Sequence, residues 1–207
     1  RNRQNHLYPE GVFPFTYQTQ TDHLSGKRGG RLTRCTESNT CPRIFNANSS
    51  NEYWVKAGSL LHTDTHGNDL PDPENVRYYL ISGLSHGVGN VTSKGLCQQF
   101  LNPTSPFPAL RALLVALDGW VTAGTAPPAS QVPRRADNTA VMAVPRPGHQ
   151  TAIVPQEKLG WPTIPGVTYT GVITARYHLD FGSKLDQGLI SNYPTSPAGR
   201  PAYPIFV

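Results

Sequence analysis

The hydrophobic positions of residues 43–81 follow two spacings, which predict a strand, a helix and a second strand. Residues 43–48 form a short strand candidate, and residues 76–81 are rich in β-branched and aromatic side chains, as strands are. Between them, the stretch Ser-Ser-Asn-Glu opens a segment of helical spacing that predicts a helix over about residues 49–62. Its apolar positions are Tyr53, Trp54, Ala57, Leu60 and Leu61.

A longer helix is predicted from residue 105 to residue 124. Ser105 is a good cap residue, Pro106 suits the first helical position, and Gly124 suits the end of a helix. The apolar positions between them fall on one stripe, formed by Leu110, Leu113, Leu114, Leu117, Trp120 and Val121. The order strand, helix, strand, loop, long helix is typical of the second half of an α/β unit.

The rest of the chain shows weaker patterns around this core, and we interpret residues 1–207 as a single unit. Residues 1–42 read as an irregular arm rich in aromatic residues and Pro, residues 43–124 as the core, and residues 125–207 as a loop-rich tail with strands. One strand is expected within 167–175. The last five residues, 203–207, read like a strand cut short, so we expect a piece of a longer chain.

Composition excludes several classes of protein. Only 15% of the residues are charged, whereas Gly 19 and Pro 20 indicate many turns. No apolar run is long enough to span a bilayer, and neither heptads nor longer repeats occur. The net charge of +5 is dilute, with short basic pairs at 27–28 and 134–135. Because nucleic-acid binding needs clustered cations, we expect no such partner.

The cysteines favour a location outside the cytoplasm. Cys35 and Cys41 bracket a polar, turn-forming stretch, so a disulfide closing this loop is one interpretation and two free thiols are the other. Cys97 is left over. Glycosylation acceptor patterns begin at Asn48 and Asn90, and each is a weak signal by itself. Together with the low charge, these features predict a secreted or periplasmic protein.

His86 is the leading candidate for chemistry. It follows the predicted strand 76–81, and in open α/β sheets ligands bind beyond the carboxyl ends of the strands. A loop histidine there suits a general base, although loop backbone groups would also satisfy its ring. Residues 83–87 match G-x-S-x-G literally. We reject Ser85 as a nucleophile because no helix is predicted after it, as that motif requires.

Glu52 and the segment 62–69 are further candidates. Glu52 follows the first predicted strand, where an acid could orient an imidazole, but Ser49-x-x-Glu52 is also a capping box. The His62–Asp69 loop carries residue types that bind Zn²⁺ or Ca²⁺ in no standard spacing, so a solvated loop is the simpler interpretation. Asp118, at the polar edge of the long helix, is interpreted as a surface residue.

Several blocks of the sequence together resemble a poorly characterised α/β-hydrolase domain family. They include Asn-Ser-Ser-Asn-Glu-Tyr-Trp at 48–54, the strand from residue 76 with Gly-x-x-His-Gly at 83–87, the long helix over 110–121, and Gly-Thr-x-Pro-Pro-x-Ser at 124–130. Phe-Pro-Phe at 13–15 and the stretch 161–167 resemble it as well. The resemblance implies the C-terminal part of an α/β-hydrolase-type sheet, with flanking helices and a long Pro/Gly-rich loop region.

The resemblance also implies a serine hydrolase acting on carboxylic esters, with His86 as the triad histidine and Glu52 as its acid. The chain order in this fold is nucleophile, acid, histidine, so the nucleophile is expected upstream of Arg1. No cofactor is needed, and the partners expected are a small ester and a complementing or identical chain. One alternative is a non-catalytic binding or self-assembling protein built from such a half-domain. Another is a metal-dependent enzyme using the 62–69 loop.

Overall fold

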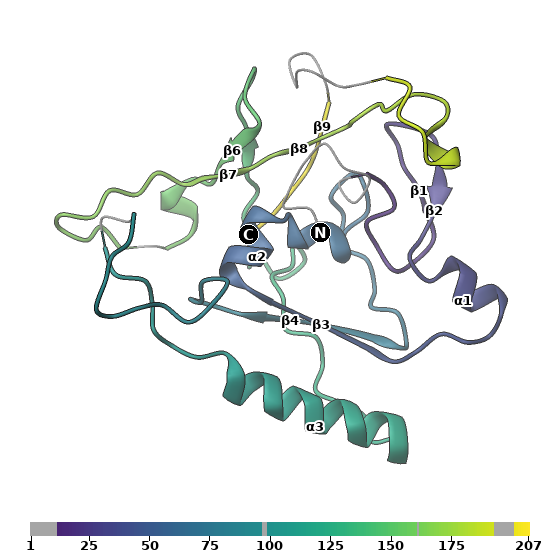
Figure 1. The fold of residues 1–207 in the computed structure, drawn as a ribbon, viewed down its shortest axis with the longest axis horizontal. Coiled ribbons are helices and arrows are strands. Elements are labelled where there is room, and N and C mark those ends of the chain that lie inside the picture. The colour runs from purple at the N-terminus through teal and green to yellow at the C-terminus, as the bar shows by residue number, and fades with distance from the viewer. Residues whose placement is uncertain (1–11, 97–98, 161, 193–200) are drawn as a thin grey trace.

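A computed structural model describes residues 12–96, 99–160, 162–192 and 201–207 of the chain (Figure 1). Cys97 and the first eleven residues lie outside the described part. The structure has a mixed architecture of short strands and helices. In chain order the elements are β1 Gln20–Thr21, β2 Arg28–Gly29, α1 Thr33–Glu37, β3 Ile44–Ser49, α2 Ser50–Val55, η2 Gly58–Leu61, β4 Val76–Ile81, α3 Phe107–Ala123, β5 Val144–Pro145, β6 Thr151–Ile153, η3 Gln156–Lys158, β7 Val172–Thr174, β8 Arg176–Tyr177, η4 Leu185–Gln187 and β9 Ala202–Tyr203.

The central unit consists of two parallel strands between two helices. β3 and β4 pair in register from Ile44 opposite Val76 to Ser49 opposite Ile81. In Figure 1, α2 lies on one side of this strand pair and α3 on the other. A bridge between Tyr79 and Gln131 extends the pairing beyond β4. Within the described residues, β3 pairs with β4 alone. Both predicted strands are therefore confirmed to within a residue.

The helix predicted over 49–62 is shorter than expected. α2 ends at Val55, and Ala57 adopts a left-handed conformation with φ 57° and ψ 51°. A turn of 3₁₀ helix then continues the chain. This turn places Gly58 against Tyr53, where an added Cβ would lie 2.5 Å from the ring atom Cδ2. The break therefore coincides with a close packing of the turn on α2, which apolar spacing alone does not reveal.

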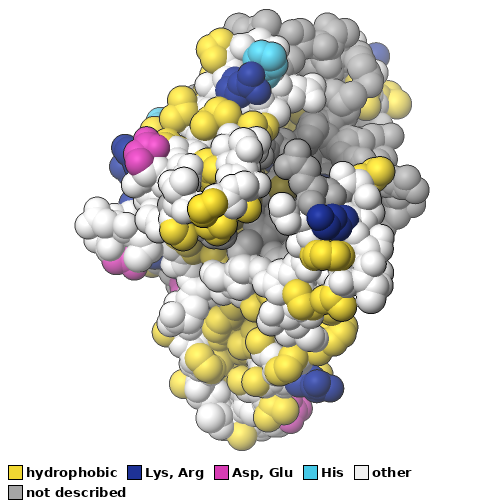
Figure 2. All heavy atoms as spheres, turned by 90° about the vertical axis from the view of Figure 1, so that its left-hand side faces the viewer, with side chains coloured by type: hydrophobic (Ala, Val, Ile, Leu, Met, Phe, Trp, Pro, Cys, Tyr) yellow, Lys and Arg dark blue, Asp and Glu magenta, His cyan; other side chains and the backbone are white. Residues whose placement is uncertain are grey.

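The predicted long helix forms as α3, but its apolar stripe is largely uncovered. Gly124 ends it with φ 70°, as expected, and the Ser105 hydroxyl accepts a hydrogen bond from the Phe107 N–H at 3.3 Å. Among the stripe residues only Trp120 is buried; its ring stacks on Phe45 at 5.7 Å. Figure 2 shows hydrophobic side chains gathered over the lower part of the molecule, where α3 lies. The exposed members of the stripe are Leu110, Leu114 and Val121.

The main hydrophobic core lies on the other side of α2. It joins the 57–60 turn to the antiparallel sheet β5-β6-β7 and to the last residues of the chain. Residues from all three predicted sections of the chain contribute to it: Phe13, Phe15, Ala57, Leu60, Ala143, Ala152, Val154, Ile173, Ala175, Tyr203, Ile205 and Val207. Phe13 and Phe15 of the aromatic arm are thus part of the core. Of the stretch 167–175, where one strand was expected, only Val172–Thr174 forms a strand, β7.

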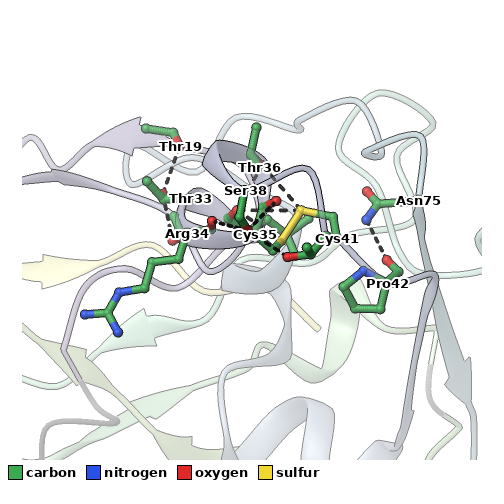
Figure 3. The surroundings of a disulfide bond; sticks show 12 residues. Thr19, Thr33, Arg34, Cys35, Thr36, Ser38, Cys41, Pro42 and Asn75 are labelled. Carbon is green, nitrogen blue, oxygen red and sulfur yellow. Dashed lines mark hydrogen bonds between the residues drawn. A yellow bond between two sulfur atoms is a disulfide. The ribbon is translucent and has the colours of Figure 1, made fainter.

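The cysteine pair forms the disulfide that one of our two interpretations required. The Cys35 and Cys41 sulfurs are bonded at 2.02 Å, and the bond closes the short helix α1 onto the loop after it (Figure 3). Asn75, just before β4, donates its side-chain N–H to the Pro42 carbonyl at 2.7 Å. The disulfide loop is thereby held beside the start of the β3–β4 pair.

Candidate active site

The parallel pairing of β3 and β4 brings the two candidate residues together. Ser49 and Ile81 are partners at the carboxyl ends of the two strands. Glu52 lies three residues beyond the first end and His86 five residues beyond the second. Their side chains meet, with Glu52 Oε1 at 2.8 Å from His86 Nδ1. The arrangement follows the rule that sites in such sheets lie beyond the carboxyl ends of the strands.

Glu52 makes both of the contacts that the sequence left in competition, the capping box and the contact with His86. Its Oε2 accepts the Ser49 backbone N–H at 2.7 Å, and the Ser49 hydroxyl accepts the Glu52 N–H at 3.3 Å, which completes a capping box. The other oxygen, Oε1, remains for His86. The cap fixes the carboxylate at the N-terminus of α2, so the imidazole meets an acceptor held in one position.

The contact with Glu52 determines which nitrogen of His86 carries its hydrogen. An ionised carboxylate only accepts hydrogen bonds, so Nδ1 donates and, in the neutral ring, Nε2 bears the lone pair. Nε2 has no hydrogen-bond partner among the described residues, and the side chain is 81% exposed. The neutral ring therefore presents a proton acceptor to the outside of the strand ends.

The pKa of Glu52 keeps the carboxylate in its ionised form. Burial pushes this pKa up, but the hydrogen bond from the Ser49 backbone and that from His86 outweigh the burial, so the pKa lies below its ordinary value. Glu52 is therefore an anion at neutral pH, able to accept the Nδ1 hydrogen and to stabilise a positive charge on the ring.

Two residues that we did not predict hold the loop carrying His86. The Ser50 hydroxyl accepts the Gly83 N–H at 2.9 Å, and the Asn102 side chain donates to the Gly83 carbonyl at 2.7 Å. The Asn51 N–H also bonds the Leu84 carbonyl at 3.3 Å, and the Leu84 side chain is buried. Ser50 could have been inferred from its place at the strand end, but nothing in the sequence marks Asn102.

The Ser85 hydroxyl is hydrogen-bonded within its own loop and not to His86. The acceptor is the Gly87 carbonyl, and none of the described residues between 86 and 106 is helical. Within the described residues, no hydroxyl or thiol group is hydrogen-bonded to His86 Nε2. The geometry thus provides an acid and a base, and the described part of the chain pairs no nucleophile with them.

The polar side chains His62 and Asp64 of the 62–69 loop are hydrogen-bonded to other protein groups. His62 is buried and its Nε2 lies 2.8 Å from the Tyr53 hydroxyl, while Asp64 accepts the backbone N–H groups of His66 and Asn68. Burial, with a smaller contribution from the Arg134 charge, lowers the pKa of His62 to about 4. In the part of the chain that the structure describes, no three His, Cys, Asp or Glu side chains are grouped so as to hold a metal ion.

Comparison with known proteins identifies the family. A family model described as an alpha/beta hydrolase domain matches residues 6–154, which is more than half of the chain. The chain therefore belongs to this alpha/beta hydrolase domain family. No curated protein and no solved structure matches the chain. Among the described helices, none combines the length and apolar character needed to cross a bilayer.

Proposed function

We propose that the protein is a serine hydrolase that cleaves carboxylic esters, with His86 as the general base and Glu52 as its acid partner. The observation that supports this best is the 2.8 Å contact between Glu52 Oε1 and His86 Nδ1 beyond two parallel strands, in a chain of the alpha/beta hydrolase family. The contact leaves Nε2 as the proton acceptor, which is the arrangement of a catalytic triad.

In the proposed reaction a serine hydroxyl attacks the ester carbonyl while His86 Nε2 takes its proton. The tetrahedral intermediate collapses, and the same proton passes to the oxygen of the leaving alcohol. Water then attacks the acyl-enzyme carbonyl while His86 Nε2 takes its proton, and this proton passes to the serine oxygen as the carboxylic acid is released. Glu52 holds the ring and stabilises its charged form throughout. The chemistry needs no cofactor.

We place the serine in a segment upstream of residue 1, so that this chain supplies the C-terminal half of the hydrolase domain. The chain order of the fold, nucleophile before acid before histidine, supports this placement. So do the second edge of β3, which pairs with no other described strand, and the uncovered apolar stripe of α3. Both features suit a sheet and a helix layer that continue into further structure.

His86→Ala in the natural protein that carries this chain tests the proposal. We expect kcat for a small ester such as p-nitrophenyl acetate to fall on the order of 10⁴-fold, because the base is lost. His149→Ala, at an exposed histidine elsewhere, is the control and should leave the rate unchanged. Equal rates for the wild type and His86→Ala would reject the assignment.

We also propose that the protein works outside the cytoplasm. A disulfide between Cys35 and Cys41 persists in secreted or periplasmic compartments and is rare in the reducing cytosol. Fractionation of the source cells, followed by detection with an antibody against this chain, tests the proposal. Recovery in the cytosolic fraction would contradict it.

A second candidate function is self-assembly without catalysis. The open edge of β3 and the apolar stripe of α3 favour it, because exposed strand edges and apolar faces associate. Light scattering on the 207-residue chain distinguishes the candidates: this function requires defined oligomers, and a monodisperse monomer over the accessible concentrations would reject it.

A further inference from the structure

The segment directly after His86 exposes an unusual number of large apolar side chains. Residues 88–96 and 99–101, which we call the apolar segment, follow His86 by two positions. Five of its side chains are exposed: Val88, Val91, Leu96, Phe100 and Leu101. The segment lies on the left-hand side of Figure 1, beyond the end of β4, and this side faces the viewer in Figure 2. Grouped apolar exposure of this kind marks binding surfaces.

The apolar segment is nearly free of charge. Lys94 is its single charged residue, and the ammonium group lies over the Phe100 ring at 5.4 Å from the centroid. No carboxylate occurs between residues 75 and 117 of the sequence. The surface therefore suits an uncharged, apolar group rather than a cation.

The backbone ties the apolar segment to the loop that carries His86. The Gly89 N–H donates to the Asn102 carbonyl at 3.0 Å, and the Asn102 side chain donates to the Gly83 carbonyl at 2.7 Å. Gly89 and Leu101 are so close that a Cβ on Gly89 would lie 2.6 Å from the Leu101 backbone. These contacts form a neck that holds Val88 and Leu101 next to the catalytic loop.

We propose that the apolar segment binds the apolar acyl group of the ester that the Glu52–His86 pair hydrolyses. The inference rests on the proposed function and specifies its substrate class: esters with an acyl chain of several methylenes rather than acetyl esters. The position supports a substrate group over a second protein copy, since the neck fixes this surface to the loop of the catalytic base. The side chains at the neck, Val88 and Leu101, contact the acyl chain.

A chain-length series in the natural protein that carries this chain measures the effect on catalysis. We expect kcat/KM to rise from p-nitrophenyl acetate to p-nitrophenyl hexanoate, by up to about fourfold for each methylene that the segment covers. The double variant V88S/L101S should flatten this rise, so that the ratio of the hexanoate kcat/KM to the acetate kcat/KM falls toward one. V144S/L189S removes side chains of similar exposure in other segments, Val144 matching Val88 at 51%, and should keep the rise.

A second pair of variants tests the neck without changing any apolar side chain. Gly89→Ala forces the 89–102 contact apart, whereas Gly87→Ala meets nothing within 4 Å. We expect the first to flatten the chain-length series and the second to preserve it. A wild-type series that is flat, or one that V88S/L101S leaves unchanged, would overturn the inference.

Binding to the 207-residue chain separates this inference from the proposed reaction. We would follow the methyl NMR signals of Val88 and Leu101 while adding hexanamide or acetamide, which are not esters. Larger shifts with hexanamide than with acetamide support the acyl site even if no ester is hydrolysed, in which case the proposed function alone fails. Equal shifts, or a change of oligomeric state in V88S/L101S instead, would overturn the inference.

Discussion

At the scale of single residues, Glu52 shows how one carboxylate supports both a helix and a candidate catalytic base. Sequence reasoning sets capping against orientation of His86, since both need the same side chain. The structure divides the work between two oxygens, Oε2 for the Ser49 N–H and Oε1 for His86 Nδ1. The two roles can therefore be separated by substitution.

Ser49→Ala should weaken the cap and largely spare activity. The loss of the hydroxyl that accepts the Glu52 N–H should lower the free energy of unfolding by about 1 kcal/mol. Glu52→Gln should instead lower ester hydrolysis in the natural protein by at least 10³-fold, roughly the cost of disturbing a triad acid. Urea unfolding and ester assays on both variants check this. Comparable losses of activity in the two would contradict the division of roles.

The burial of His62 predicts that the free energy of unfolding falls in acid. Its pKa is about 4 in the folded protein because of burial and the nearby Arg134, against about 6.5 in an unfolded chain. The unfolded chain thus binds more protons between these values, so the free energy of unfolding is complete above pH 6.5 and falls as the pH drops toward 4. The full shift corresponds to roughly 3 kcal/mol.

Urea unfolding from pH 7 to pH 4 checks this prediction. His62→Gln keeps a polar group near the Tyr53 hydroxyl but cannot take up the proton, so its stability should change less over this range than that of the wild type. Parallel pH curves for the two proteins would show that other groups cause the acid sensitivity.

At the scale of elements, local patterns determine where strands and helices form, and packing determines where some of them stop. β3, β4 and the end of α3 at Gly124 follow from residue types and spacing, and the strand order explains why Glu52 and His86 meet. The early end of α2 is accompanied by Gly58 lying against Tyr53, a contact that spacing does not encode. The hydrogen bond from the Asn102 side chain to the Gly83 carbonyl also joins positions far apart in the sequence, so local patterns do not predict it.

The same substitution at two glycines should therefore have opposite effects. Gly58→Ala places a Cβ 2.5 Å from the Tyr53 ring and should destabilise the fold by about 1–3 kcal/mol. Gly119→Ala, inside α3 with its nearest neighbour at 4.0 Å, should stabilise it by about 0.5–1 kcal/mol. Thermal or urea unfolding measures both. A stable Gly58→Ala variant would mean that the turn after α2 is looser than the structure indicates.

At the scale of the whole molecule, the main feature that the sequence did not predict is that the two sides of the β3–β4 pair are unequally buried. The apolar stripe of α3 reads as a buried face, yet Leu114 is 65% exposed. The core forms on the opposite side of α2 instead, from residues near both ends of the described chain. A pattern along the chain reports that a face is apolar and says nothing of which segment covers it.

Leu114→Lys tests whether upstream structure covers that stripe. In the 207-residue chain the side chain is exposed, so the free energy of unfolding should change by no more than about 0.5 kcal/mol. If the natural protein has the upstream segment that we propose, the stripe should be covered there, and a buried unpaired ammonium should then cost about 2 kcal/mol or more. Val115→Lys, about 100° further around the helix, is the control. Its effect on the free energy of unfolding should be small in both the 207-residue chain and the natural protein.

Leu114→Lys also distinguishes the two candidate functions. If α3 instead associates with a second copy, Leu114→Lys should lower the mass that light scattering gives for the 207-residue chain, and its effect on unfolding should depend on protein concentration. A small, concentration-independent effect in both proteins would mean that nothing covers the stripe. The placement of this chain as the C-terminal half of a hydrolase domain would then lose its structural support, while the Glu52–His86 pair would still need its nucleophile.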